Sequence, residues 1–281
     1  MDKPLKAYED VAFLKTDACR PARLELEFLK PEVAMQANNI KSTIVLFGSA
    51  RIPDPAAAQE RLAAAEKAAA VTPADPAAAD VLRRARALAK LSHYYTVARE
   101  FAAMVSRCSQ TIEACHFVIT TGGGGGIMEA GNRGAADMHA KSIGLNISLP
   151  YEQAPNPFIT PDLLFQFHYF SIRKMHFLMR AKALCVFPGG LGTLDELFEV
   201  LTLIQTHKIR PIPVVLFGRA FWQAVIHLEF LVEQGLINRT DLNLFRYCET
   251  AQEAWEYIHA YWSRAHDTAD EAGTRYGCGA E

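Results

Sequence analysis

The sequence lacks the motifs of several common metal, redox and cofactor classes. Its six cysteines include no CxxC pair, and its nine histidines include no HExxH motif. Without these spacings a zinc site is not expected, and a disulfide scaffold is not expected either. Several cysteines lie inside apolar helix or strand patterns, which is typical of reduced and buried thiols. We therefore expect a cytoplasmic protein with no metal and no cofactor.

Clusters of positive charge and long apolar runs are also missing. Lys and Arg number 29 against 31 Asp and Glu, which gives a formal net charge of −2, and no basic run occurs. Since binding to a phosphate backbone needs clustered Lys and Arg, a nucleic-acid partner is not expected. There is no run of 18 apolar residues, and the N-terminal segment MDKPLKAYED has no apolar core. We therefore expect neither a membrane-spanning helix nor a signal peptide.

Three nucleotide and hydrolase signatures are absent as well. The dinucleotide motif GxGxxG needs a third glycine, but that position holds Asp195 in one glycine-rich turn and Ile127 in another. Neither turn provides the GK[ST] end of a P-loop, and no GxSxG motif occurs. These absences argue against NAD binding, ATP hydrolysis and the α/β-hydrolase class.

What the sequence does have is a regular alternation of short apolar runs with amphipathic segments. Strands are predicted at 43–47, 116–121, 142–150, 163–170, 184–187 and 211–217. Helices are predicted at 94–108, 128–140, 172–183, 194–206, 220–234 and 251–262. This alternation predicts an α/β fold in which helices cover both faces of a parallel sheet. In such sheets ligands bind beyond the carboxyl ends of the strands, so a site is expected at the strand-to-helix turns.

The predicted sheet defines one main domain over residues 42–265. Residues 1–41 have helical patterning but no strand, and we interpret them as an N-terminal helical extension. Residues 52–91 are rich in alanine and contain four prolines. Because alanine favours helix and proline ends it, this insertion is interpreted as two exposed helices joined by a loop, with a low-complexity linker as the alternative. Residues 266–281 form a C-terminal tail.

Three strand-to-helix turns have the composition of a phosphate site. They are FGSAR at 47–51, TTGGGGGIMEA at 120–130 and PGGLGTLDE at 188–196. A helix N-terminus presents unpaired N–H groups with a partial positive charge, and glycine lets an anion approach them closely. The alternative is that the glycines only make tight turns. Two such glycine-rich turns in one sheet favour the phosphate ligand.

The segment SIRKMHF, residues 171–177, has two cations at the start of a predicted helix. Ser171 could cap this helix, and Arg173 and Lys174 would then follow in its first turn. Cations there oppose the helix dipole, at a cost of up to about 1 kcal/mol each. Either both side chains are simply solvated, or an anionic ligand at a functional site balances their charge.

Glu196 also has two interpretations. The spacing Thr193-Leu194-Asp195-Glu196 fits an S/T-x-x-E capping box, in which the glutamate serves only the helix start. Alternatively, Glu196 is a functional carboxylate close to the predicted phosphate site. Spacing alone favours the cap.

Together these segments resemble the LOG ("lonely guy") family of nucleoside-5′-monophosphate phosphoribohydrolases, whose members are often mislabelled as lysine decarboxylases. PGGLGTLDE matches the family signature PGGxGTxxE, and TTGGGGGIMEAGNRGA resembles its TGGGxGxMEAxxxGA segment. IRKMH resembles its Arg-Lys pair, FGSAR its first-strand turn, and GLNISLPYEQAPN a loop of the longer bacterial members. The motifs occur in the family's order, and the resemblance covers residues 43–50 and 93 to about 260.

The resemblance implies a Rossmann-like, doubly wound fold and a homodimer or larger homo-oligomer with its sites near the interface. It also implies hydrolysis of the N-glycosidic bond of AMP, or of an N6-substituted relative such as a cytokinin nucleotide, to the free base and ribose 5-phosphate. Carried over by position, Arg173 and Glu196 are the catalytic pair. The implied substrate-binding residues are Ser49, Gly123, Gly124, Gly126, Met128, Glu129, Lys174, Pro188, Gly189, Gly190, Gly192 and Thr193. Within this set, Gly190, Gly192 and Thr193 would hold the 5′-phosphate, and Glu129 would lie near the ribose.

Physical chemistry agrees with these implied roles. Cleavage of a ribosyl C–N bond builds positive charge on the sugar, which a carboxylate stabilises, and the same carboxylate can take a proton from water. An arginine can orient the carboxylate and hold sugar or phosphate oxygens in a bidentate way. Two other functions stay open. One is a non-catalytic nucleotide or molybdenum-cofactor carrier on the same fold, and the other is a PLP-dependent lysine decarboxylase using Lys174. The alanine-rich insertion also leaves open the shape of the pocket at Ser49.

Overall fold

A computed structural model describes residues 4–111, 114–148 and 154–267 of the chain. The predicted C-terminal tail lies outside the described residues from 268 onward, and so does the stretch 149–153 of the predicted loop 144–156. Among the described residues, no helix is both long enough and apolar enough to cross a bilayer. Four of the five described cysteines are buried, namely Cys19, Cys115, Cys185 and Cys248, in agreement with the prediction of mostly buried thiols.

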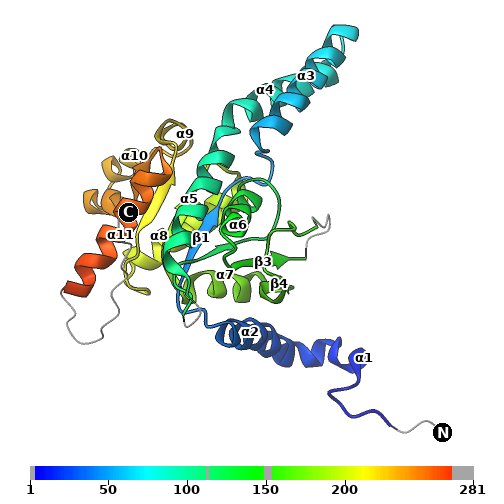
Figure 1. Ribbon diagram of the computed structural model, residues 1–281, viewed down its shortest axis with the longest axis vertical. Helices are drawn as coiled ribbons and strands as arrows, with labels where there is room; N and C mark the ends of the chain where they lie inside the picture. Colours follow the sequence, from blue (N-terminus) through cyan, green and yellow to red (C-terminus); the bar gives the residue numbers. More distant parts are fainter. Residues whose placement is uncertain (1–3, 112–113, 149–153, 268–281) are drawn as a thin grey trace.

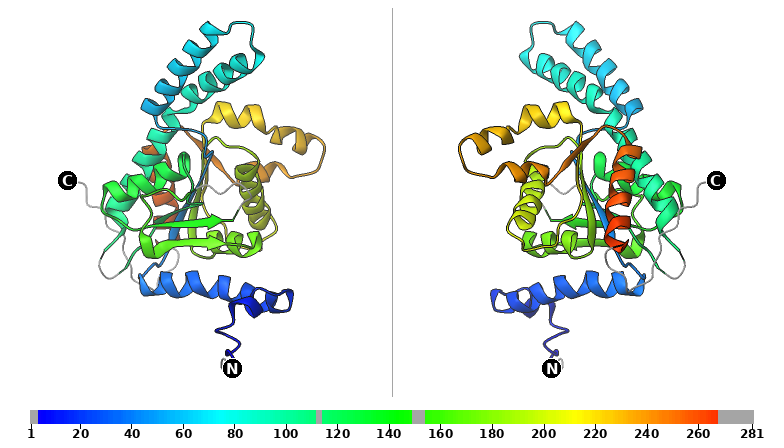
Figure 2. Two further views of the ribbon diagram at one scale, coloured as in Figure 1. Left: turned by 90° about the vertical axis from the view of Figure 1, so that its right-hand side faces the viewer. Right: turned by 90° about the vertical axis from the view of Figure 1, so that its left-hand side faces the viewer.

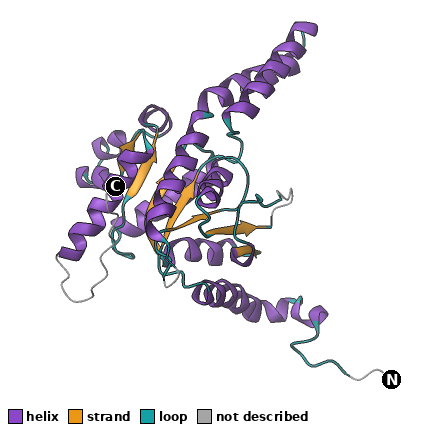
Figure 3. Cartoon of the chain, viewed as in Figure 1, coloured by secondary structure: helices purple, strands orange, loops and turns teal. Residues whose placement is uncertain are grey.

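Seven parallel strands form one sheet in the order β4-β3-β2-β1-β5-β6-β7. The strands are β1 (Thr43–Phe47), β2 (Val118–Thr121), β3 (Ser142–Ile147), β4 (Leu164–Phe167), β5 (Ala181–Val186), β6 (Val214–Phe217) and β7 (Arg246–Cys248). Figure 3 shows them surrounded by helices. The predicted α/β fold with a parallel sheet is therefore confirmed.

Helices cover both faces of the sheet, as Figure 2 shows. Alternate residues of β1 enter different hydrophobic cores: Ile44 and Leu46 lie in one, Val45 and Phe47 in the other. The first core includes residues of α5 (His93–Ser109), α6 (Ile127–Asp137) and α11 (Ala251–Asp267). The second includes residues of α2 (Arg20–Ala37), α7 (Phe170–Met179), α8 (Leu191–Gln205) and α9 (Arg219–Val225). The sheet is thus doubly wound.

The alanine-rich residues form a helical hairpin of α3 (Pro55–Val71) and α4 (Pro76–Leu91), which projects away from the sheet (Figure 1). Each helix begins with proline at its first position after an aspartate cap. Asp54 accepts hydrogen bonds from Ala56 N and Ala57 N, and Asp75 accepts one from Ala77 N. The short elements that complete the described chain are α1 (Val11–Leu14), η1 (Asp17–Cys19), η2 (Pro161–Leu163), α10 (Leu228–Glu233) and η3 (Arg239–Asn243).

Three segments differ from the sequence prediction. Residues 181–183, predicted as the end of the helix 172–183, belong to β5, because α7 ends at Met179. The helix predicted at 220–234 is interrupted between α9 and α10, because Ile226 has extended backbone (φ −132°, ψ 121°). β-branched Val225 and Ile226 at the break favour this conformation. The edge strand β7 is also missing from the prediction. It has only three residues, which is too short to produce a recognisable periodic pattern.

Candidate active site

The three predicted turns follow β1, β2 and β5, which are neighbours at the centre of the sheet. On one side of β1 lie β2, β3 and β4, in that order toward the edge of the sheet. The next strand along the chain, β5, lies on the other side of β1. The last residues of the two strands at this reversal, Phe47 and Val186, lie opposite each other. In doubly wound sheets the ligand crevice opens beyond the carboxyl ends at such a reversal. The turns therefore lie where a ligand site is expected.

Backbone hydrogen bonds join the three turns to one another. Ser49 N donates to the carbonyl of Pro188 at 3.0 Å, and Ile127 N donates to the carbonyl of Ser49 at 3.2 Å. Gly126, which directly precedes Ile127, has φ +64°, and a Cβ at this position would overlap the carbonyl of Ser49. Only glycine combines that left-handed backbone with so close an approach. Ser49 thus links the two glycine-rich turns.

The start of α8 is open toward solvent. Its N-cap is Gly190, and no side chain caps the helix. A Cβ added at Gly190 or Gly192 would meet no heavy atom within 4 Å, so neither glycine is required by close protein packing. By contrast, a Cβ at Gly189 would overlap the side chain of Thr193. An uncapped helix N-terminus with free space above two glycines suits an anion.

The capping-box interpretation of Glu196 is wrong. The helix begins at Leu191 rather than after Thr193, so Thr193 lies inside the first turn and its N–H donates to the carbonyl of Gly190. The side chain of Glu196 therefore does not serve as a cap. It points into the protein, and the residue is only 6% exposed.

Glu196 has an unusual protonation equilibrium for a glutamate. Burial raises the pKa of Glu196 to about 7, and the neighbouring positive charges of Lys174 and Arg173 offset part of that rise. The negative charges of Glu199 and Asp195 act in the same direction as burial. A carboxyl group with a pKa near neutral pH is suited to proton transfer.

Arg173 belongs to α7, and its side chain extends to the glycine turn after β2. Its Nε donates to the carbonyl of Leu145 at 2.7 Å, and a Cβ at Gly122 would come within 2.7 Å of its Nη2 and 2.9 Å of Met128 Sδ. Burial lowers the pKa of Arg173, while the charge of Glu196 raises it. The guanidinium is therefore a partly buried cation over the second turn, and it interacts electrostatically with Glu196.

Ser171 does not cap α7, contrary to the sequence interpretation. The N-cap residue is Tyr169, and its side chain makes no capping hydrogen bond to the first turn of the helix. Because α7 begins at Phe170, Ser171 lies within the first turn and Arg173 N makes the first intrahelical bond, to the carbonyl of Tyr169 at 3.2 Å. Arg173 still lies close to the positive end of the helix dipole.

Lys174 bridges α7 to α8. Its Nζ lies 2.8 Å from Asp195 Oδ2 and 2.8 Å from Glu199 Oε2, and its side chain is 17% exposed. These two acids flank Glu196 in the sequence of α8. Lys174 thus neutralises the acidic surroundings of Glu196 and favours its ionised form.

Glu129, predicted near the ribose, has a partner that the sequence does not reveal. The hydroxyl of Tyr95 on α5 donates to Glu129 Oε1 at 2.7 Å, and burial raises the pKa of Tyr95 to about 12. Tyr95 therefore stays protonated and remains a donor at neutral pH. It lies in an ordinary amphipathic helix without any motif, so no local signal identifies it.

A buried amide network supports the second glycine turn. Asn156 Nδ2 donates to the carbonyls of Gly123 and Gly124 at 3.2 and 3.0 Å, and to Asn132 Oδ1 at 3.0 Å. Thr121 Oγ1 also donates to Asn132 Oδ1, at 2.7 Å, and accepts from Gly123 N at 3.0 Å. The sequence contains Asn156 in the loop 144–156 but gives no sign of this contact. These hydrogen bonds fix the conformation of the turn.

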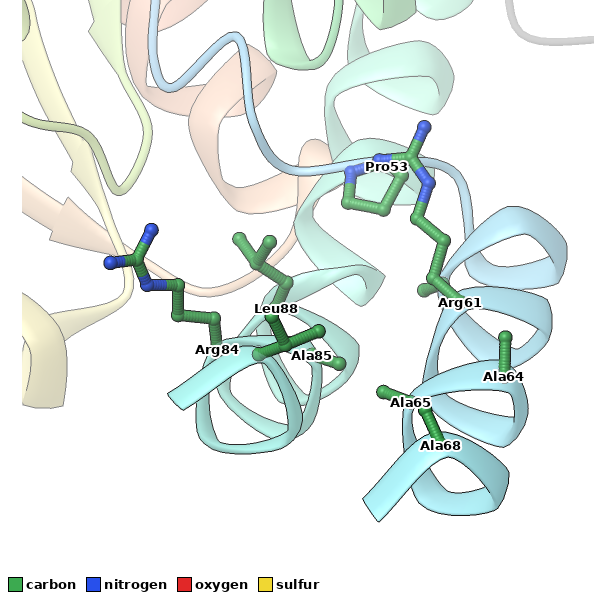
Figure 4. Close-up of a pocket in the computed structure, with 10 residues that line it drawn as sticks. Pro53, Arg61, Ala64, Ala65, Ala68, Arg84, Ala85 and Leu88 are labelled. Carbon is green, nitrogen blue, oxygen red and sulfur yellow. The ribbon is translucent and has the colours of Figure 1, made fainter. Parts of the chain in front are cut away.

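A cavity of about 460 Å³ lies elsewhere, between α3 and α4 (Figure 4). Alanines make up half of its lining, and the other residues include Pro53, Leu88 and the two arginines Arg61 and Arg84. None of the predicted site residues contributes to it. This cavity belongs to the hairpin and not to the turns at the end of the sheet.

Comparison with known proteins agrees with the motifs. The family model described as "Possible lysine decarboxylase" matches residues 128–258. A curated pyrimidine/purine nucleotide 5′-monophosphate nucleosidase of Escherichia coli K12 is 32% identical over 115 residues, which are 36% of this chain and 24% of that protein. The chain thus aligns with about a quarter of the length of this relative. The resemblance predicted from the motifs is confirmed.

Solved structures with a similar arrangement have little sequence in common with this chain. A molybdenum-cofactor carrier protein of Chlamydomonas reinhardtii is 15% identical, with a TM-score of 0.46 over 80% of this chain and 99% of the other. A molybdenum-cofactor binding protein of Rippkaea orientalis is 18% identical, with a TM-score of 0.40 over 60% of this chain and 88% of the other.

Proposed function

We propose that this chain, which resembles the nucleoside-5′-monophosphate phosphoribohydrolases, hydrolyses the N-glycosidic bond of a nucleoside 5′-monophosphate. The products are the free base and ribose 5-phosphate. The observation that carries the proposal is Glu196: a buried carboxyl group with a pKa of about 7, little more than one helical turn from an uncapped helix start. The curated nucleosidase supports the same reaction class through its match to part of this chain.

In the proposed mechanism, two turns bind different parts of the nucleotide. Backbone N–H groups at the start of α8, near Gly190 and Gly192, bind the 5′-phosphate, because the space above them is open. Glu129 binds the ribose hydroxyls in an orientation fixed by Tyr95. With the phosphate and ribose held in this way, the anomeric carbon lies close to Glu196.

The chemical step then needs one base and one cation. Glu196 takes a proton from water, whose oxygen bonds to the anomeric carbon while the C–N bond breaks. The electron pair of that bond leaves with the base, which is protonated by solvent. The charge of Glu196 stabilises the positive charge that develops on the sugar, and Arg173 orients Glu196 and the substrate oxygens.

Within this class we propose AMP or an N6-substituted adenine nucleotide as the substrate, following the family resemblance. The test is incubation of the protein with a panel of nucleoside 5′-monophosphates, with chromatography for the free base and an assay for ribose 5-phosphate. Equimolar release of both products from at least one nucleotide is expected. Release of inorganic phosphate alone, or no product from any nucleotide, would contradict the proposal.

The phosphate should dominate binding affinity. AMP should raise the melting temperature, whereas adenosine at the same concentration should raise it far less, because the glycine turns are proposed to bind the phosphate. A ligand at about 100 times its dissociation constant adds roughly 2.7 kcal/mol to the free energy of unfolding, which a thermal melt detects. Ribose 5-phosphate is the control that contains the phosphate without the base. Equal increases of the melting temperature from AMP and adenosine would contradict the proposed phosphate site.

The pH dependence should follow the protonation of Glu196. A general base works only when ionised, and the pKa of Glu196 is about 7, so kcat/KM should rise about tenfold per pH unit below pH 7 and level off above it. The measurement is kcat/KM for AMP between pH 5 and 9. Because a phosphate monoester also titrates near pH 6, AMP affinity is measured in parallel over the same range. A rate that falls as pH rises through 7 would instead make Glu196 a general acid.

A further inference from the structure

The N-terminal helix α2 contacts the start of α7, the helix that contains Arg173. The carboxylate of Glu27 accepts two backbone hydrogen bonds there, from His168 N at 2.8 Å and from Tyr169 N at 3.1 Å. Arg23 Nη2 lies 3.4 Å from the hydroxyl of Tyr169. The N-cap region of α7 is therefore held by side chains that belong to α2.

The same helix also holds the other end of α7. Arg180, the C-cap residue, makes a bidentate ion pair with Glu32 of α2, in which Nη2 lies 2.8 Å from Oε2 and Nη1 contacts Oε1. Between the two ends, the buried ring of His176 lies 5.3 Å from the ring of Phe28. Figures 1 and 2 show α2 beside α7 along the lower edge of the molecule. Contacts thus run along the length of α7.

The helix α7 needs such support for two physical reasons. It has only ten residues, and isolated helices of this length are marginal in water. Its first turn contains no acidic residue, and the cations Arg173 and Lys174 lie near its positive end. Glu27 provides the missing negative charge at that end, from outside the helix. The sequence of α7 alone does not stabilise the conformation in which Arg173 lies over Gly122.

We propose that α2 is a positioning element of the candidate active site, in which Glu27 and Glu32 fix both ends of α7 and so hold Arg173 over the glycine turn. Both glutamates are positioning residues, since they contact α7 and not the predicted ligand. This inference gives the N-terminal extension a role and rests on the proposed function of Arg173. It predicts that α2 controls turnover more than substrate affinity.

The test compares Glu27→Gln with Glu25→Gln, an exposed glutamate on the same helix. Glu27→Gln keeps the shape of the side chain but removes the charge and one of the two acceptors. We expect kcat for AMP to fall about tenfold, since misplacement by about 1 Å can cost up to about 100-fold. KM should change less than about threefold, because the phosphate contacts are backbone groups of α8. Glu25→Gln should match the wild type in both parameters.

Hydrogen exchange provides a second readout that does not depend on catalysis. Amides of residues 170–179 should exchange faster in Glu27→Gln than in Glu25→Gln or the wild type, while amides of β1 should not. Glu32→Gln, which loosens the opposite end of α7, should repeat both effects and covers the case in which Glu27→Gln fails to fold.

The outcomes separate the inference from the proposed function. Unchanged exchange in α7, or faster exchange with an unchanged kcat, overturns the positioning role. A wild-type protein that hydrolyses no nucleotide overturns the proposed function, and the exchange data then still decide whether α2 fixes α7. Lower kcat with faster exchange supports both.

Discussion

Replacement of Glu196 by Gln is expected to lower kcat for base release by at least about 100-fold, the loss that is typical when a general base is removed. Gln has nearly the same shape but is neutral and hardly basic, so it neither takes a proton from water nor stabilises positive charge on the sugar. AMP should still bind, since the proposed phosphate contacts are backbone groups of α8. The measurement is a steady-state rate with AMP, together with a thermal melt at several AMP concentrations.

Stability provides the control for this variant. Because burial raises the pKa of Glu196 in the folded protein to about 7, above its ordinary value of 4.5, the wild type loses part of its stability as pH rises from 4.5 through 7. Glu196→Gln removes that loss, so the variant should melt at a temperature equal to or above that of the wild type at pH 8. Glu233→Gln on the exposed surface of α10 is the matched substitution and should change neither rate nor stability. A Glu196→Gln protein that turns over AMP at the wild-type rate would rule out the proposed mechanism.

Arg173→Ala is expected to abolish most turnover, with a loss of about 100-fold or more in kcat. The substitution removes the cation next to Glu196, which should raise the pKa of Glu196 further and move the pH profile to higher pH. Folding should survive, because a desolvated cation near the positive end of α7 is itself unfavourable. The measurement is the pH profile of kcat/KM for the variant beside that of the wild type.

Arg173→Lys separates charge from geometry. Lysine keeps the positive charge but does not have the planar fork of arginine, and the bond to the carbonyl of Leu145 depends on Nε of that fork. We expect intermediate activity and a pH profile close to that of the wild type. If Arg173→Ala lowers the melting temperature while turnover is retained, Arg173 is a structural residue of the α7–β3 contact.

The sequence predicts the position of the site better than its supporting contacts. Glycines directly after apolar runs locate the turns at 120–130 and 188–196. Both signals are local, because the apolar run indicates the strand and the glycines indicate the turn that ends it. The start of α8 is different. Whether the helix begins at Leu191 or after Thr193 depends on how the chain leaves β5, which spacing does not encode. For this reason the capping box fits the sequence and fails in the structure.

The remaining supports are long-range and leave no local pattern. Tyr95 reaches Glu129 from another helix, Asn156 reaches Gly124 from a loop, and Glu27 reaches Tyr169 across more than half the chain. Each partner is an ordinary residue in its own segment, and only packing of the sheet against its helices brings the pairs together. The burial that raises the pKa of Glu196 has the same origin.

The central place of β1 has a consequence for the order in which the chain assembles. Its partners are β2, near Val118, and β5, near Ala183, so during synthesis β1 leaves the ribosome long before either of its neighbours exists. The hairpin of α3 and α4 can close early because its contacts are local, but pairings between distant strands form slowly. Until β5 arrives, at least one edge of this apolar strand is exposed to other nascent chains, which is a hazard for aggregation. The three turns of the candidate site, which need β1, β2 and β5 together, therefore form only at the end, and under the proposed function nucleotide binding would identify a chain whose central sheet is complete.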